Sequence, residues 1–136
     1  MYFTIWYGVY RKSTRTLSYS GGGHPPPLLI SRGSGNAGIA ELDSPSAPIG
    51  IMTETEFPTV ETTVPPGSSL FVYSDGAIEV FPTPGKLWGV AGLVEFMQGH
   101  DTTQAPCLDA LQEIVIKYTG SDVLADDFSI FLAQFP

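Results

Sequence analysis

Two acidic motifs in this sequence lie at the borders of strongly apolar runs. Asp75 lies in the stretch VYSDGAIEV, just after the apolar run Leu70–Tyr73. Asp126 and Asp127 come directly before a second apolar run, FSIFL. Burying an unpaired carboxylate costs several kcal/mol, so acids at such places need a partner. Mg²⁺ and Mn²⁺ prefer oxygen ligands and take one or two carboxylates each, so two strand ends that present acids predict a divalent metal site.

The first motif also has a simpler interpretation. Asp75 and Gly76 form a common turn pair, which could do no more than end a strand. The second motif favours the metal site over this turn, because it brings another acid to another strand end. Since neighbouring strand residues point to opposite faces, we expect only one of Asp126 and Asp127 to face the site.

Four other features could carry chemistry, and for each a structural role is favoured. His24 has no second His or Cys close by, which favours a turn histidine bonded to the backbone over a metal ligand. His100 follows a helical pattern and is expected to complement the helix dipole at the surface. Cys107 has no basic neighbour in sequence and is expected to be a small buried hydrophobe. Residues 33–38 read G-x-G-x-x-G, but no helix follows, so we expect a hairpin loop and not a dinucleotide site.

Composition limits the class of protein. The chain has 136 residues, enough for a single domain with a real core. Its formal net charge of −8 disfavours DNA or RNA as a partner, because binding phosphates requires clustered Lys and Arg. The single cysteine allows no internal disulfide and favours the cytoplasm. The apolar runs are strand-sized, so no membrane span is expected.

The elements that must position these residues follow an α+β order: antiparallel strands, two helices and a final strand. Residues 2–10 are apolar on both alternation faces, which predicts a strand covered on both sides. Apolar residues spaced i, i+3, i+4 and i+7 predict helices over 90–98 and 106–118, ended by Gly99 and Gly120. Further strands are expected at 14–20, 28–31, 39–42, 59–63, 69–74 and 128–135.

Four segments carry a resemblance to a known family. They are YFTIWYGVY…TRTLSYSGGGHPPPLLI, SAPIGI, VPPGSSLFVYSDGAIEV and ADDFSIFL, in this order. Together they resemble the C-terminal half of a SpoIIE/RsbU-type phosphatase domain, a member of the PPM (protein phosphatase 2C-like) family. The resemblance covers nearly the whole chain, from Tyr2 to Phe135. It implies part of an α/β/β/α sandwich, with antiparallel sheets and flanking helices.

The resemblance also implies a site and an activity. Asp75 and Asp126 match metal-binding acids of the family, and Gly76 and Asp127 lie beside them. In the intact family domain these acids help to hold two Mn²⁺ or Mg²⁺ ions, and a metal-bound water attacks a phosphoserine or phosphothreonine. The implied partners are a phosphoprotein substrate, typically an anti-sigma-factor antagonist in bacterial signalling, and an attached sensor or regulatory domain.

One departure from the family pattern changes these expectations. The family's N-terminal half supplies two further Asp-containing segments, and nothing in residues 1–136 matches either. We therefore expect one N-terminally incomplete domain that binds metal weakly, is nearly or wholly inactive alone, and exposes sheet surface or edges. A homodimer could rebuild such a domain. A non-catalytic interaction module with the same fold is the main alternative, and an unrelated β-rich ligand-binding domain is a weaker one.

Overall fold

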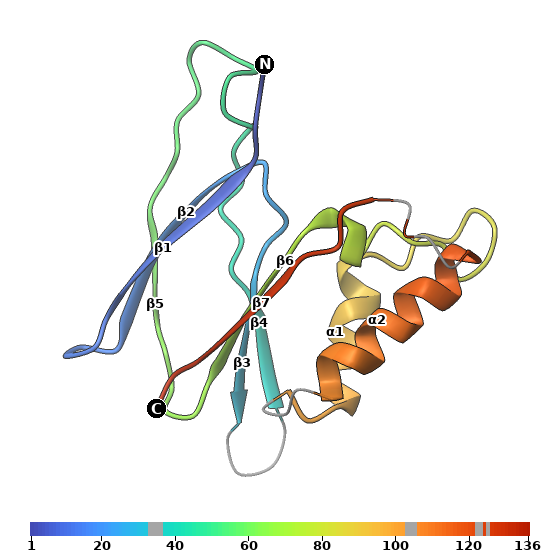
Figure 1. The fold of residues 1–136 in the computed structure, drawn as a ribbon. Helices are drawn as coiled ribbons and strands as arrows, with labels where there is room; N and C mark the ends of the chain where they lie inside the picture. Colours follow the sequence, from blue (N-terminus) through green and yellow to red (C-terminus); the bar gives the residue numbers. More distant parts are fainter. Residues whose placement is uncertain (33–36, 103–105, 122–123, 125) are drawn as a thin grey trace.

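Two antiparallel sheets and two helices form three layers in the computed structural model (Figure 1). The structure describes residues 1–32, 37–102, 106–121, 124 and 126–136. The three-stranded sheet has the order β1 (Ile5–Arg11), β2 (Thr16–Gly22), β5 (Val60–Thr63). The four-stranded sheet has the order β4 (Ala37–Glu41), β3 (Leu28–Arg32), β6 (Ser69–Tyr73), β7 (Ile130–Gln134). The helices are α1 (Gly89–Gly99) and α2 (Pro106–Thr119), and both cover the four-stranded sheet. The predicted α+β class is confirmed.

The alternation of side chains along the four-stranded sheet divides them between two cores. One face packs under α1 and α2, in a core that includes Leu28, Ile30, Phe71, Tyr73, Leu93, Met97, Leu111 and Val115. The other face packs against the three-stranded sheet, in a core that contains Leu17, Tyr19, Leu29, Leu42, Val64 and Leu70. Strand β6 contributes to both cores and pairs with a strand on each side. It is therefore a rigid base for the residues that follow it.

The predicted elements are present, with some ends shifted. The hairpin expected around residues 33–38 is found, because β3 and β4 pair antiparallel with Arg32 opposite Ala37; residues 33–36 lie outside the described part. Helix α2 begins at Pro106 as predicted, and Gly120 follows it with a φ of 69°. Gly99 is the last residue of α1 and not its cap. No helix in the described ranges is long and apolar enough to cross a membrane.

The prediction that the first strand is covered on both faces is wrong for this chain. Trp6 and Tyr10 pack into the core between the sheets. On the opposite face, Tyr7 is 63% and Val9 is 52% exposed. Both helices lie on the other sheet, so nothing in the described chain covers this outer face (Figure 1). The separate expectation that the chain exposes sheet surface is confirmed.

Burial of Tyr73 leads to a prediction about alkaline pH. Its side chain is 2% exposed, and its hydroxyl donates a hydrogen bond of 2.8 Å to the Pro26 carbonyl. Burial, and then the negative charge of Glu41, raise the pKa of Tyr73. An unfolded tyrosine ionises near pH 10, before the folded one, so the free energy of unfolding falls as the pH rises above about 10.

We expect the variant Tyr73→Phe to lose less stability in this range, by up to about 1.4 kcal/mol per pH unit. Urea unfolding of both proteins at a series of pH values from about 8 to 11 tests this, with each protein compared with its own value at the lowest pH. Parallel stability curves for the two proteins would contradict the prediction.

Candidate functional site

Asp75 begins a single 3₁₀ turn, η1 (Asp75–Ala77), at the end of β6. The Ala77 amide donates to the Ser74 carbonyl at 3.0 Å, and this bond starts the turn. The Asp75 side chain is exposed, and its Oδ1 accepts a hydrogen bond of 3.1 Å from the Gly76 amide. The Asp-Gly pair therefore forms a turn, as its simpler interpretation expects. The same turn leaves a carboxylate at the surface.

Asp126 and Asp127 lie in the segment that leads into β7. Both side chains are exposed, and Asp126 Oδ1 accepts a hydrogen bond of 2.7 Å from the Asp127 amide. Since β7 begins only at Ile130, neither acid belongs to a strand. The alternation argument, which predicted that only one of them faces the site, therefore does not apply.

The two acidic segments lie against each other at Gly76. A Cβ atom at this position would lie 2.5 Å from the Asp127 carbonyl oxygen and 3.3 Å from that of Asp126. Gly76 does not have a positive φ, so it is the close approach of the backbones that requires glycine. The structure thus brings together the two motifs that the sequence singled out, 126–127 and 75–76.

A residue that the sequence analysis missed joins the two segments. Ser74 Oγ donates a hydrogen bond of 2.7 Å to the Asp127 carbonyl and accepts one of 2.9 Å from the Ser129 amide. The Ser74 amide also donates to the Ser129 carbonyl at 3.0 Å. The only signal in the sequence is a hydroxyl residue placed directly before the Asp-Gly pair. That signal says nothing about which distant segment the hydroxyl meets.

The acids of this site have the chemistry of a hard-cation ligand set. Asp75, Asp126 and Asp127 are exposed, and none of them forms an ion pair with another described residue. Within the same described part of the chain, no three His, Cys, Asp or Glu side chains lie together as a metal-binding group. Mg²⁺ and Mn²⁺ use one or two carboxylates and keep several waters. The residues present therefore fit part of a ligand set, and not a complete cage.

An open groove begins within one turn of Asp75. It has a volume of about 430 Å³ and lies between residues 79–84 and the end of α2. The Glu79 amide donates to the Asp75 carbonyl at 2.8 Å, so the groove and the carboxylate are joined by a single helical turn. Phe81, on the groove wall, is 52% exposed. The chain that follows Asp75 therefore leads directly into a concave and partly apolar surface.

The two histidines have the structural roles that the sequence favoured. His24 Nδ1 lies 2.7 Å from the Pro25 carbonyl oxygen, which makes it a turn histidine bonded to the backbone. His100 follows α1, and its Nδ1 lies 2.7 Å from the Phe96 carbonyl oxygen while its ring stacks on Phe96. Both rings therefore hold local backbone, and neither belongs to a metal-binding group of described residues.

Cys107 is buried and its thiol is free. Burial, and then the charge of Asp101, raise the pKa of Cys107, while Arg32 acts in the opposite direction. A raised pKa keeps the thiol protonated, which is the unreactive form. The expectation of a small buried hydrophobe is confirmed.

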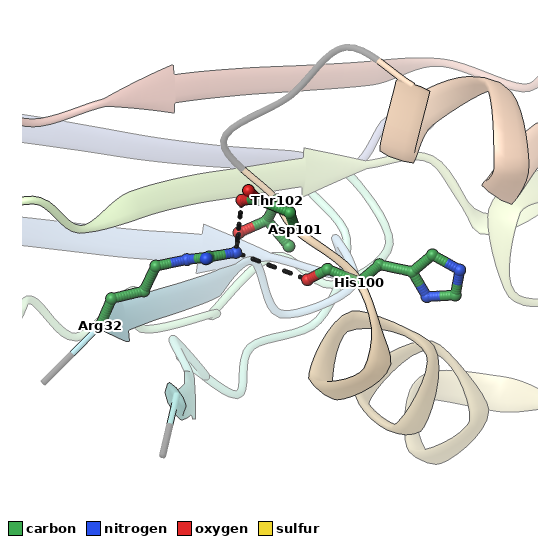
Figure 2. A network of polar contacts seen from close by, with 4 residues as sticks. All are labelled: Arg32, His100, Asp101 and Thr102. Atoms are coloured by element: carbon green, nitrogen blue, oxygen red, sulfur yellow. Dashed lines mark hydrogen bonds and ion pairs between the residues drawn. The ribbon is translucent and has the colours of Figure 1, made fainter. Parts of the chain in front are cut away.

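Arg32 ties the end of β3 to the segment after α1, as Figure 2 shows. Its Nη2 lies 2.8 Å from Asp101 Oδ1 and donates to the His100 carbonyl and the Thr102 hydroxyl, each at 3.4 Å. This end of β3 pairs with the start of β6, whereas Asp75 follows the end of β6. The network therefore holds residues 100–102 against the end of β3, at the opposite end of β6 from Asp75.

One family model matches the whole sequence, and the chain is also similar to a curated protein. The sequence model described as "Stage II sporulation protein E (SpoIIE)" matches residues 1–136. Among curated proteins, Protein IcfG of Synechocystis sp. is 24% identical over 131 residues, which cover 96% of this chain and 20% of that protein.

Three solved structures illustrate the likeness of fold. The phosphatase domain of the cell fate determinant SpoIIE from Bacillus subtilis, presoaked with Mn, matches with a TM-score of 0.70 at 18% identity, covering 97% of this chain and 56% of that chain. The SiaA-PP2C domain of Pseudomonas aeruginosa matches with a TM-score of 0.72 at 19% identity, covering 90% and 48%. The RsbU and RsbW domains of a Mycobacterium tuberculosis protein match with a TM-score of 0.65 at 24% identity, covering 97% and 36%. The chain thus spans about half of the first two solved chains and a fifth of the curated relative.

Proposed function

Because the chain belongs to the stage II sporulation protein E (SpoIIE) family of PP2C-type phosphatase domains, which act in signalling, we propose that it contributes half of a metal-dependent protein serine/threonine phosphatase site. The observation that carries this proposal is the meeting of two acidic segments at Gly76, with Asp75 on one and Asp126 on the other. Both acids are exposed, and each keeps one carboxylate oxygen that no described residue hydrogen-bonds.

In this proposal, Asp75 and Asp126 hold Mn²⁺ or Mg²⁺ through carboxylate oxygens, and Gly76 and Asp127 support them. When bound, such an ion supplies an activated water and neutralises charge on a phosphoryl group. The chain's own contribution is to bring the two segments that carry these acids together at the end of β6. The manganese presoak of the Bacillus subtilis relative supports Mn²⁺ as the ion to test first.

The proposed substrate is a phosphoserine or phosphothreonine protein, and within bacterial signalling an anti-sigma-factor antagonist. An attached sensor or regulatory domain would control the activity. Another structure of Bacillus subtilis SpoIIE contains its phosphatase domain with a fragment of its regulatory domain, which supports an attached regulatory domain. The single, unpaired Cys107 supports a reducing compartment such as the cytoplasm.

We further propose that the 136-residue chain alone turns over little or no substrate. Two acids can hold a hard ion only weakly when the other positions are left to water. A non-catalytic interaction module is the second candidate, and it is favoured by the absence of any three-residue metal-binding group among the described residues.

Titration with Mn²⁺, followed by electron paramagnetic resonance, tests the proposed site. We expect weak binding by the wild-type chain that is lost in Asp75→Asn and in Asp126→Asn, because each substitution removes an anionic ligand. Asp109→Asn is the matched control, since Asp109 is exposed in the first turn of α2, at the other end of the sheet (Figure 1). Equal binding by all four proteins would contradict the site.

A phosphatase assay with an aryl phosphate and Mn²⁺ tests whether the chain is active alone, whereas the Mn²⁺ titration separates the two candidate functions. The isolated chain is expected to show no turnover above the Asp75→Asn background. Clear turnover that depends on both acids would show that the chain is active alone. Manganese binding without turnover is the result that the half-site proposal expects.

A further inference from the structure

We propose that Ser74 is a positioning residue: its hydroxyl holds the Asp126–Asp127 segment against Asp75 and thereby sets the metal affinity of the acid pair. The inference rests on the proposed function, because the ion concerned is the one proposed above. Ser74 itself is not proposed as a ligand. Its hydroxyl is engaged by the protein on both sides, through Asp127 and Ser129.

The first argument is the way in which the β6–β7 ladder ends. Tyr73 pairs with Ile130, so the same register places Ser74 opposite Ser129. In a regular antiparallel ladder, every second pair of opposite residues exchanges both backbone hydrogen bonds, and the Ser74–Ser129 pair is of this kind. One of these bonds is made, from the Ser74 amide to the Ser129 carbonyl at 3.0 Å. The Ser74 carbonyl instead accepts from Ala77, as β6 gives way to η1.

The Ser74 hydroxyl takes the place of that diverted carbonyl. It accepts the hydrogen bond of the Ser129 amide at 2.9 Å, which the ladder would otherwise have given to the Ser74 carbonyl. Because the hydroxyl replaces the carbonyl as the acceptor, β6 can turn into η1 while β7 stays attached to it. A residue without a side-chain acceptor at position 74 would leave the Ser129 amide without this partner.

The second argument is the bond that the same hydroxyl donates. A serine hydroxyl has one hydrogen to donate. The Asp127 carbonyl lies 2.7 Å from Ser74 Oγ and the Ser129 carbonyl 3.5 Å, so the hydrogen is donated to Asp127. This holds the backbone of the segment that carries Asp126, on the side where Gly76 lets it approach most closely. The segment is thus fixed at residues 127 and 129, just beyond the acid.

Two carboxylates that share an ion repel each other when the ion is absent, so something must hold them in place. A hydroxyl that fixes both backbones reduces the rearrangement that binding requires. Groups that orient metal ligands typically change metal affinity by about 10–100-fold when they are removed. We therefore expect Ser74→Ala to weaken Mn²⁺ binding by about tenfold or more, and Ser74→Thr to retain it.

The experiment uses the full chain and Mn²⁺ alone, with affinity read by electron paramagnetic resonance. Ser31→Ala is the matched control, because Ser31 Oγ also donates to a carbonyl across a strand pair, that of Gly38 at 3.2 Å, at the other end of the same sheet. Ser74→Thr and Ser74→Val form a second comparison, since their side chains have similar shapes and differ in the hydroxyl. Amide hydrogen exchange without metal is measured for Ser129, with Phe131 inside β7 as an internal reference. Phe131 lies opposite Val72, two residues on from the Ser74–Ser129 pair, so by the alternation of an antiparallel ladder its amide also faces β6.

Weaker Mn²⁺ binding and faster exchange at Ser129 in Ser74→Ala and Ser74→Val, with Ser74→Thr and Ser31→Ala close to wild type, would support the inference. Unchanged Mn²⁺ affinity in Ser74→Ala, while Asp75→Asn abolishes binding, would overturn the inference and leave the proposed function intact. If Asp75→Asn itself does not alter binding, the proposed function fails, and the metal role of Ser74 fails with it. Unchanged exchange at Ser129 would overturn the hydroxyl's structural role independently of any metal.

Discussion

The variant Gly76→Ala is expected to lower the free energy of unfolding by about 1–3 kcal/mol and to push the two acidic segments apart. The added methyl group would lie 2.5 Å from the Asp127 carbonyl oxygen, which is backbone and cannot move away by a change of rotamer. Because Gly76 does not have a positive φ, the cost comes from this contact and not from backbone strain. Urea unfolding measures the loss, and Mn²⁺ binding should weaken in the same variant.

Gly99→Ala is the matched control for this prediction. Gly99 ends α1, has no positive φ, and a Cβ atom there would meet no heavy atom within 4 Å. Alanine is the better helix former, so this variant should be unchanged or more stable by up to about 1 kcal/mol. Equal unfolding free energies for Gly76→Ala and Gly99→Ala would contradict the close approach on which the site depends.

Phe71→Ala is expected to cost still more, about 3–5 kcal/mol, because it leaves a cavity in the core under the helices. Phe71 is 1% exposed and lies on β6, opposite Leu28 on one side and Leu132 on the other. The same strand leads to Asp75, so loss of its packing should also weaken the proposed metal site. Denaturant unfolding together with the Mn²⁺ titration measures both effects.

Phe131→Ala provides the comparison within the same sheet. Phe131 lies on the neighbouring strand β7 and is 61% exposed, so its ring contributes little buried area. Its removal should change the free energy of unfolding by no more than about 0.5 kcal/mol. If the two phenylalanine variants were equally stable, the placement of Phe71 in the core under the helices and of Phe131 at the surface would be wrong.

Much of the fold could be predicted from the sequence because apolar spacing is a local property. The two helices and the strands that flank the acids were found with small errors at their ends. The error at Gly99 arose because a glycine that ends a helix and one that caps it produce the same pattern. The strand after Asp126 and Asp127 begins at Ile130, two residues later than the apolar run FSIFL predicts. Strand alternation therefore does not say which of the two acids faces the site, and that expectation is still a prediction.

The candidate site was predicted in part. The pairing of Asp75 with Asp126 followed from two similar motifs and from the family resemblance, and the structure brings their segments together at Gly76. Whether these acids bind a metal is still a prediction. The role of Ser74 could not be predicted, because its partners at 127 and 129 are adjacent only once β6 and β7 have paired.

The covering of the first strand could not be predicted either. Alternation shows that both faces of β1 are apolar, but it does not show whether a chain supplies a layer for each face. Here α1 and α2 both pack on the other sheet, and Phe3, Tyr7 and Val9 are left more than half exposed.

That uncovered strand has a consequence for association between molecules. β1 is an edge strand, and residues 1–10 carry no Lys, Arg, Asp or Glu side chain, so the stretch lacks the charges that keep sheet edges from pairing with each other. A protein surface that packs on β1 is therefore expected to prevent such edge-to-edge pairing.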